Sequence, residues 1–185
     1  MSTLDLLISA QRGRDLIFSK LAARGFASFG SSSRILLPTR LSGAQHIAVG
    51  DRVLIGAGSW LIVPEQKSPG PNIIIGDRVR MNQTSISGVH RVEIEEGVAL
   101  ARGCYISDHS HGFDDPDRFI RDQPLSRVAP VHIRRGAWLG NNCVVLPGVT
   151  IGAGAVIGAN SVVTSDIPDR TVAAGAPARV LRELP

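Results

Sequence analysis

The chain has few aromatic side chains, few cysteines and no long apolar run. Its 185 residues include five Phe, two Trp and one Tyr, although 43% of the chain is hydrophobic. Without an apolar run of roughly 18 residues, no membrane-spanning helix is expected. The first apolar patch contains Asp5 and no cleavage-site pattern, which argues against a signal peptide. Two cysteines do not make a disulfide framework, so a reducing, cytoplasmic location is expected.

The charge is positive but not concentrated. The formal net charge is +4 and the pI is about 9.8. The arginines are scattered, and the chain has no basic motif interleaved with aromatic residues. This pattern argues against nucleic acid as a partner and is compatible with a small polyanionic ligand.

Aliphatic or small residues recur every six positions through most of the chain. One series begins at the residue before Gly in "VTIGAG" and similar segments: Val49, Ile55, Leu61, Ile75, Met81, Ser87, Ile94, Leu100, Ile106, Ile133, Leu139, Val145, Ile151, Ile157 and Val163. A second series lies two residues earlier and includes Ser59, Ser85, Cys104, Cys143 and Ser161. Because residues two apart face the same way in a strand, each unit is predicted to be a short strand and a tight turn.

Three such units make one triangular coil, so the sequence predicts a mainly β fold, a parallel β-helix of about five coils. The coils span 49–61, 75–87, 94–106, 133–145 and 151–163, and Leu37 and Gly43 extend the register toward a partial sixth. We expect one domain over 1–185. It comprises a helical cap at 1–30, the β-helix at 31–166 with an inserted loop at 107–130, and a C-terminal tail at 167–185. Cys104 and Cys143 occupy small inward positions, which favours a role in the core.

Residues 3–29 contain no hexapeptides and have a mixed helical pattern. Gly13 is a weak point, so one broken helix or two short helices are expected. The preferred role is to cap the open end of the solenoid, which such stacks require. Because its polar side carries basic residues, weak membrane contact is the alternative.

The repeats and the C-terminal segments resemble a known family. The "[LIV]-G-x-x-x-x" ladder, "WLGNN", "LPGVTIG", "IGANSVVT" and "AGAPARV" resemble the hexapeptide-repeat, left-handed parallel β-helix acetyltransferases, such as the maltose, galactoside and capsular polysaccharide O-acetyltransferases. The resemblance implies a homotrimer that transfers acetyl from acetyl-CoA to a hydroxyl of a sugar or polysaccharide precursor. Antibiotic or amino-sugar N-acetylation, a non-catalytic scaffold, and a zinc enzyme resembling the gamma-class carbonic anhydrases are the alternatives.

The segment "ISDHSHGFDDP" lies in the inserted loop and holds two of the five histidines. His90, His109 and His111 could be proposed as zinc ligands, but a neutral imidazole also suits a general base near neutral pH. The resemblance implies that His111 is the base and His109 its neighbour, with no metal required.

Three further residues are candidates at the acceptor side of this site. Asp108 and Asp114 are both candidates to orient the base. The resemblance also places Asn82 at the acceptor.

The same resemblance implies where the donor lies. Trp138 is expected to face outward, where something must cover it. "AWLGNN" matches the coenzyme A motif at Trp138 and Gly140. "IGANSVVTSD" and "GAPARV" match it at Ala159, Thr164, Ser165, Pro177 and Arg179, the last of which suits phosphate recognition.

Overall fold

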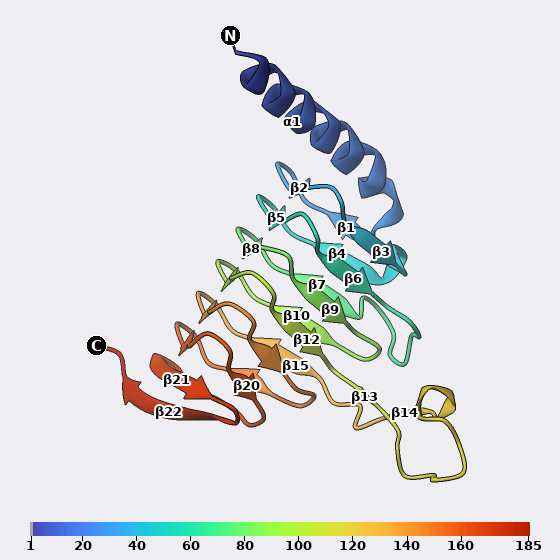
Figure 1. Ribbon diagram of the computed structural model, residues 1–185, viewed down its shortest axis with the longest axis vertical. Coiled ribbons are helices and arrows are strands. Elements are labelled where there is room, and N and C mark those ends of the chain that lie inside the picture. The colour runs from blue at the N-terminus through green and yellow to red at the C-terminus, as the bar shows by residue number, and fades with distance from the viewer. Residues whose placement is uncertain (1) are drawn as a thin grey trace.

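The fold is a left-handed parallel β-helix whose strands stack, coil upon coil, into three sheets (Figure 1). The computed structural model describes residues 2–185. Sheet 1 contains β1 (Ser28–Phe29), β4 (Ile47–Val49), β7 (Ile73–Ile75), β10 (Val92–Ile94), β15 (Val131–Ile133) and β18 (Thr150–Ile151). Sheet 2 contains β2 (Arg34–Ile35), β5 (Leu54–Ile55), β8 (Arg80–Met81), β11 (Ala99–Leu100), β16 (Trp138–Leu139), β19 (Val156–Ile157), β21 (Thr171–Gly175) and β22 (Ala178–Glu183). Sheet 3 contains β3 (Arg40–Ser42), β6 (Trp60–Ile62), β9 (Ser85–Ser87), β12 (Tyr105–Ser107), β17 (Val144–Val145) and β20 (Val162–Val163).

The core is a set of inward ladders, one for each sheet. In sheet 3 the ladder runs through Leu41, Leu61, Ile86, Ile106, Val145 and Val163, all in register. Cys104 and Cys143 are free and buried, as their inward positions predicted. The predicted mainly β, parallel architecture is therefore confirmed.

The predicted register is wrong in β9. Ser85 and Ser87 were expected to point inward, but Ile86 is buried and the two serines are only half-buried. The corner before β9 is one residue short, and Gln83 adopts a left-handed conformation with φ of 45°. The shortened corner places the large apolar side chain inside, because burying Ile is worth more than burying Ser.

The coils extend further than the predicted 31–166 at both ends. The first coil is complete, but it is built on Phe29, Ile35 and Leu41 rather than on Leu37 and Gly43. The corner after β3 carries extra residues in a short 3₁₀ helix, Ala44–His46, which shifts the register. The C-terminal tail adds β21, parallel to β19, and β22, antiparallel to β21.

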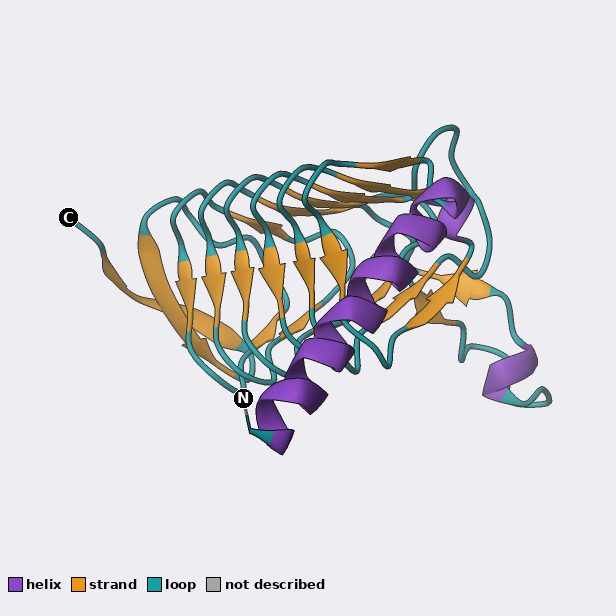
Figure 2. Cartoon of the chain, turned by 90° about the horizontal axis from the view of Figure 1, so that it is seen from above, coloured by secondary structure: helices purple, strands orange, loops and turns teal. Residues whose placement is uncertain are grey.

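The helix α1 (Thr3–Ala22) lies across the N-terminal end of the coils and continues into a 3₁₀ helix, Ala23–Gly25 (Figures 1 and 2). The helix runs through Gly13 without a break, contrary to prediction; a capping box of Ser2 and Asp5 stabilises its start. Its inner face docks by polar contacts, since the Ile35 N–H donates to Ser19 Oγ at 2.8 Å. Within residues 2–185, no helix is long and apolar enough to cross a membrane.

Candidate active site

The inserted loop leaves the stack at the end of β12 and returns to β15. It forms a two-stranded antiparallel ribbon of β13 (Ser110–His111) and β14 (Leu125–Ser126) and a 3₁₀ helix, Ile120–Asp122. Figure 1 shows this loop projecting from the side of the coils. The two histidines therefore lie at the base of the projection, next to the outer surface of sheet 3.

Asp108 anchors the loop to an earlier turn of the chain. Its side chain is fully buried and accepts three backbone N–H bonds, from Val89 at 3.0 Å and from His90 and Arg91 at 2.7 Å each. Burial alone would raise the pKa of Asp108. The hydrogen bonds from His109 and from these three N–H groups outweigh burial and hold its pKa below the usual value. Asp108 is therefore an ionised carboxylate at neutral pH.

His109 receives that carboxylate. Its Nδ1 lies 2.8 Å from Asp108 Oδ1, and its side chain is only 8% exposed. Because an ionised carboxylate can only accept, Nδ1 carries the proton in this pair. The other ring nitrogen, Nε2, is then the free acceptor and lies 3.5 Å from Ser87 Oγ. The arrangement gives His109 a fixed tautomer and a basic nitrogen directed toward Ser87.

A pocket of about 450 Å³ lies over this face. It is lined by Ile62, Pro64, Ser87, Tyr105, Ser107, His109, Ser110, His111, Leu125, Leu146 and Pro147. Ser87 and Tyr105 are site residues that the sequence analysis missed. Their signals were present, since Ser87 breaks an otherwise aliphatic series and Tyr105 is the single tyrosine of the chain.

His111 and Asp114 are placed differently from the Asp108–His109 pair. His111 lines the same pocket but is exposed, and Ser126 Oγ donates to its backbone carbonyl at 3.2 Å. Asp114 lines a separate hollow with Arg118 and Gln123. Of the two candidate orienting carboxylates, the structure brings Asp108 to a histidine, and that histidine is His109.

Asn82 is exposed at the corner between β8 and β9, and its backbone N–H donates to the Leu100 carbonyl. It is not among the residues lining the pocket of His109. The structure therefore does not bring Asn82 to the histidines within one copy of the chain.

Several predicted donor-site residues lie on sheet 2 and its corner with sheet 3. Trp138 points outward and is 47% exposed, as predicted. Gly140 follows Trp138 at the corner, and a Cβ there would lie 2.7 Å from the Ala159 nitrogen, so only glycine allows the two coils to stack this closely. Pro177 and Arg179 lie in the β21–β22 hairpin, where Arg179 is exposed.

Thr164 and Ser165 lie at a different corner, after β20. This is the corner of Leu146, whose N–H donates to the Val163 carbonyl one coil further on. Leu146 lines the pocket of His109. The predicted donor residues thus divide between the corner beside His109 and the opposite edge of sheet 3.

Metal ligation has no geometric counterpart in the part of the chain that the structure describes. Residues 2–185 contain no group of three or more His, Cys, Asp or Glu side chains close enough to hold a metal ion. His109 is bonded to Asp108 instead.

Comparison with known proteins matches this architecture. Residues 130–165 match the bacterial transferase hexapeptide (six repeats) family. Over 104 residues the chain is 39% identical to the Escherichia coli K12 protein named "Putative lipopolysaccharide biosynthesis O-acetyl transferase WbbJ", covering 53% of each chain. Over 91 residues it is 43% identical to "Probable acetyltransferase Rv3034c" of Mycobacterium tuberculosis H37Rv, covering 49% of this chain and 30% of that protein. The chain therefore spans about half, or less, of the length of these curated relatives.

Two solved structures extend the comparison to the whole fold. The hexapeptide-repeat acetyltransferase VCA0836 of Vibrio cholerae, complexed with acetyl coenzyme A, superposes with a TM-score of 0.64 at 26% identity, covering 90% of this chain and 75% of that one. AntD, an N-acyltransferase from Bacillus cereus in complex with dTDP and coenzyme A, gives a TM-score of 0.75 at 19% identity, covering 90% and 88%.

A left-handed β-helix with a histidine loop and this C-terminal sequence defines a class, the hexapeptide-repeat transferases. The chain belongs to the hexapeptide-repeat acetyltransferase family.

Proposed function

We propose that this chain is an acetyl-CoA-dependent O-acetyltransferase that acts on a hydroxyl of a sugar or polysaccharide precursor. The observation that carries the proposal is the Asp108–His109 pair, which presents a basic Nε2 in a pocket on the outer face of sheet 3. The relative WbbJ, by its name an O-acetyl transferase, supports a hydroxyl acceptor. The complex of VCA0836 with acetyl coenzyme A supports the donor.

The mechanism follows from the tautomer of His109. Nε2 accepts the proton of the acceptor hydroxyl while its oxygen attacks the thioester carbonyl carbon. The tetrahedral intermediate collapses, the C–S bond breaks, and the imidazolium returns the proton to the departing CoA thiolate. Asp108 stays ionised throughout and stabilises the imidazolium that forms between the two steps. His109 replaces His111 as the proposed base, because Asp108 orients His109 and no carboxylate approaches His111 among the described contacts.

The donor would lie along the residues matched earlier to the coenzyme A motif. We propose that Trp138, Gly140 and Ala159 contact the pantetheine arm and that Pro177 and Arg179 lie near the phosphates. Thr164 and Ser165 belong to the same proposal, from the corner that borders the pocket of His109. A cytoplasmic location is part of the proposal, because two buried free thiols suit a reducing compartment.

Release of CoA thiol from acetyl-CoA, measured with neutral sugars, nucleotide sugars, amino sugars and aminoglycosides, tests the function. We expect acceptor-dependent turnover with at least one sugar that has only hydroxyl groups, and a product ester that alkali cleaves. Turnover should persist in EDTA. Acetylation of amines alone would establish the N-acetyltransferase alternative, zinc-dependent hydration of carbon dioxide would establish the carbonic anhydrase, and failure to bind acetyl-CoA would favour a scaffold.

The site also requires an arrangement of several copies. Trp138 belongs to the outer face of sheet 2, whereas His109 follows a strand of sheet 3, so a single copy presents the donor wall and the base on different faces. We propose a homotrimer in which His109 of one copy faces Trp138 and Arg179 of the next. Such a ring of heterologous contacts closes with three equal sites.

Mixing two inactive variants tests this arrangement. We expect copies carrying His109→Ala and copies carrying Trp138→Ala with Arg179→Ala to regain activity when unfolded and refolded together. Random assembly would join an intact base to an intact wall at about a quarter of the sites. Each variant refolded alone is the control, and light scattering should give three times the 19.6 kDa chain mass. No recovery in a mixed trimer would place the complete site within one copy.

A further inference from the structure

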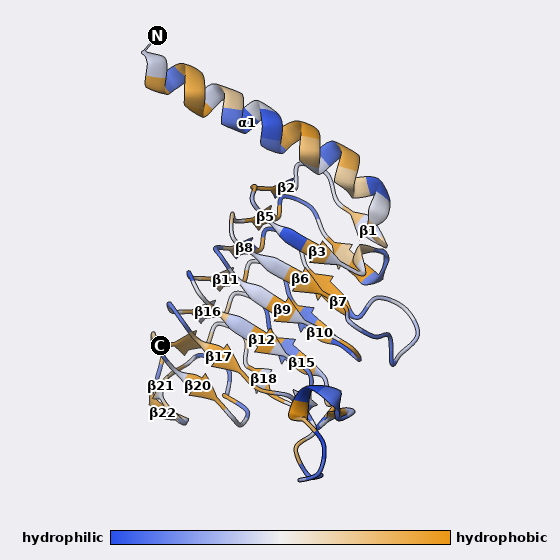
Figure 3. Ribbon diagram, turned by 45° about the vertical axis from the view of Figure 1, so that its right-hand side comes forward, coloured by the Kyte–Doolittle hydropathy of each residue, from blue (hydrophilic) through white to orange (hydrophobic). Residues whose placement is uncertain are grey.

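The helix α1 carries an unusual share of the exposed apolar side chains. Fifteen large hydrophobic residues are exposed in the described chain, and seven of them lie in this 20-residue helix. They are Leu4, Leu6, Leu7, Ile8, Leu16, Ile17 and Leu21. Figure 3 shows these apolar segments along the helix, at the end of the stack. Apolar clusters of this kind mark an interaction surface.

The outermost of these residues form one stripe. Leu6, Ala10, Gly13, Ile17 and Leu21 are spaced by three or four positions, so they share a face of the helix. The opposite face carries Asp15 and Ser19, which are buried against the first coil. Ile17 and Leu21 are 62% and 65% exposed. The helix therefore has a docked inner face and a separate apolar outer face, which this name denotes below.

The charges beside the outer face are positive and uncompensated. Arg12, Lys20 and Arg24 form no salt bridge among residues 2–185. The two acidic residues of the helix are already engaged, since Asp5 caps the N-terminus and Asp15 pairs with Arg14. A surface that meets this face should therefore be apolar in depth and anionic at its edge.

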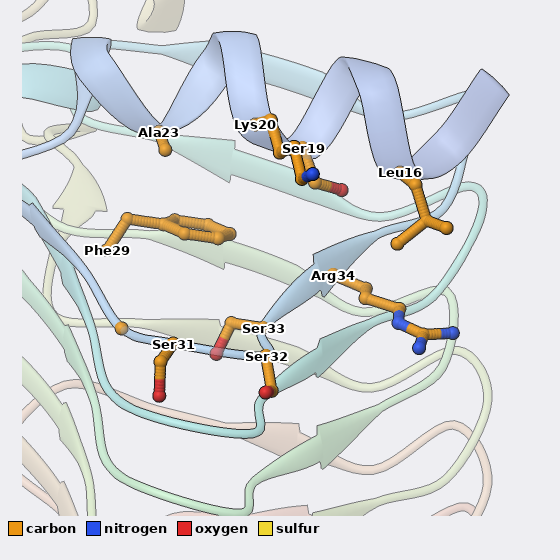
Figure 4. Close-up of a pocket in the computed structure, with 10 residues that line it drawn as sticks. Leu16, Ser19, Lys20, Ala23, Phe29, Ser31, Ser32, Ser33 and Arg34 are labelled. Atoms are coloured by element: carbon orange, nitrogen blue, oxygen red, sulfur yellow. The ribbon is translucent and has the colours of Figure 1, made fainter. Parts of the chain in front are cut away.

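A pocket of about 490 Å³ opens on the flank of the helix, between α1 and the first coil. Leu16, Ala23 and Phe29 provide its apolar wall, and Lys20 and Arg34 provide cations at the rim (Figure 4). Ser31 and Ser32 line the floor, whereas the Ser33 hydroxyl is used within the fold, donating to the Gly50 carbonyl. A phosphate bearing an apolar tail suits this combination of groups.

We propose that α1 binds the surface of a bilayer that contains anionic phospholipids. The helix lies parallel to the bilayer with the outer face in the acyl boundary, and a headgroup phosphate enters the pocket at Lys20 and Arg34. A second copy of the helix would be the other occupant, but two such helices would bring uncompensated cations together. The proposal is independent of the acetyl transfer and adds a membrane surface as a partner.

Co-sedimentation with vesicles tests this inference. The full chain is mixed with vesicles of phosphatidylcholine alone, and with vesicles of equal parts phosphatidylcholine and phosphatidylglycerol. We expect binding to the anionic vesicles that falls as salt is raised, because the attraction to surface charge is screened. Added inorganic phosphate should not compete.

Matched variants separate the outer face from general stickiness. Ile17→Ser with Leu21→Ser should weaken vesicle binding at least about tenfold, because two aliphatic side chains leave the acyl boundary. Val180→Ser with Leu181→Ser, also exposed but in β22, is the control and should bind normally. Lys20→Ser with Arg24→Ser should remove the preference for anionic vesicles. Circular dichroism checks that each variant is folded.

Four results would overturn the proposal. They are no vesicle binding by the wild-type chain, equal binding to neutral and anionic vesicles, competition by inorganic phosphate, and dissociation of the oligomer by Ile17→Ser with Leu21→Ser. The third would assign the pocket to a free phosphate, and the last would assign the outer face to a second copy of the chain.

Discussion

Replacing His109 with alanine should lower kcat by about 10²–10⁴-fold, the range that a positioned general base supplies. The reason is geometric, since Asp108 holds the Nδ1–H of His109 and leaves Nε2 as the proton acceptor in the pocket. The affinity for acetyl-CoA should change little, because the base acts on the acceptor proton and not on the donor. Steady-state kinetics and direct measurement of acetyl-CoA binding separate these two effects.

His111→Ala is the matched control for this experiment. His111 lies two residues away on the same loop, lines the same pocket and is exposed, so its loss should cost less than about tenfold through altered loop geometry. Asp108→Asn should fall between the two, because an amide cannot stabilise the imidazolium as a carboxylate does. A larger loss from His111→Ala than from His109→Ala would return the base to His111.

The fold could be predicted from the sequence because its information is local and repeated. A strict six-residue spacing identifies strand, turn and inward position unit by unit, and each error occurs where the spacing changes. The corner before β9 is one residue short, and the corner after β3 carries a 3₁₀ helix. In both places the burial of large aliphatic side chains, Ile86 in one and Leu41 in the other, determined the register.

The site was less accessible to prediction because its key contacts join distant segments. Asp108 is identified as the orienting carboxylate by three N–H groups of the turn at 89–91, and no spacing rule connects that turn to the loop. Ser87 enters the pocket only because β9 is shifted in register. The outward position of Trp138, by contrast, followed directly from the alternation within its strand.

The register of β9 leads to the second large effect, which is on folding. Ile86→Asp should lower the free energy of unfolding by more than about 4 kcal/mol, because it places an unpaired carboxylate in the inward ladder between Leu61 and Ile106. Since a domain of this kind is stable by only about 5–15 kcal/mol, the variant should be largely unfolded or insoluble. Urea unfolding followed by circular dichroism measures the loss.

Ser85→Asp provides the control, because Ser85 lies next to Ile86 on the outer side of the same strand. Its carboxylate would remain in contact with solvent beside Trp60 and Tyr105, the residues paired with Ser85 on the neighbouring strands. The cost should stay within about 1 kcal/mol, as for other surface substitutions. The uninterrupted six-residue register makes the opposite prediction, with Ser85 and Ser87 inside and Ile86 outside. A folded Ile86→Asp chain together with an unfolded Ser85→Asp chain would therefore restore that register and remove Ser87 from the pocket of His109.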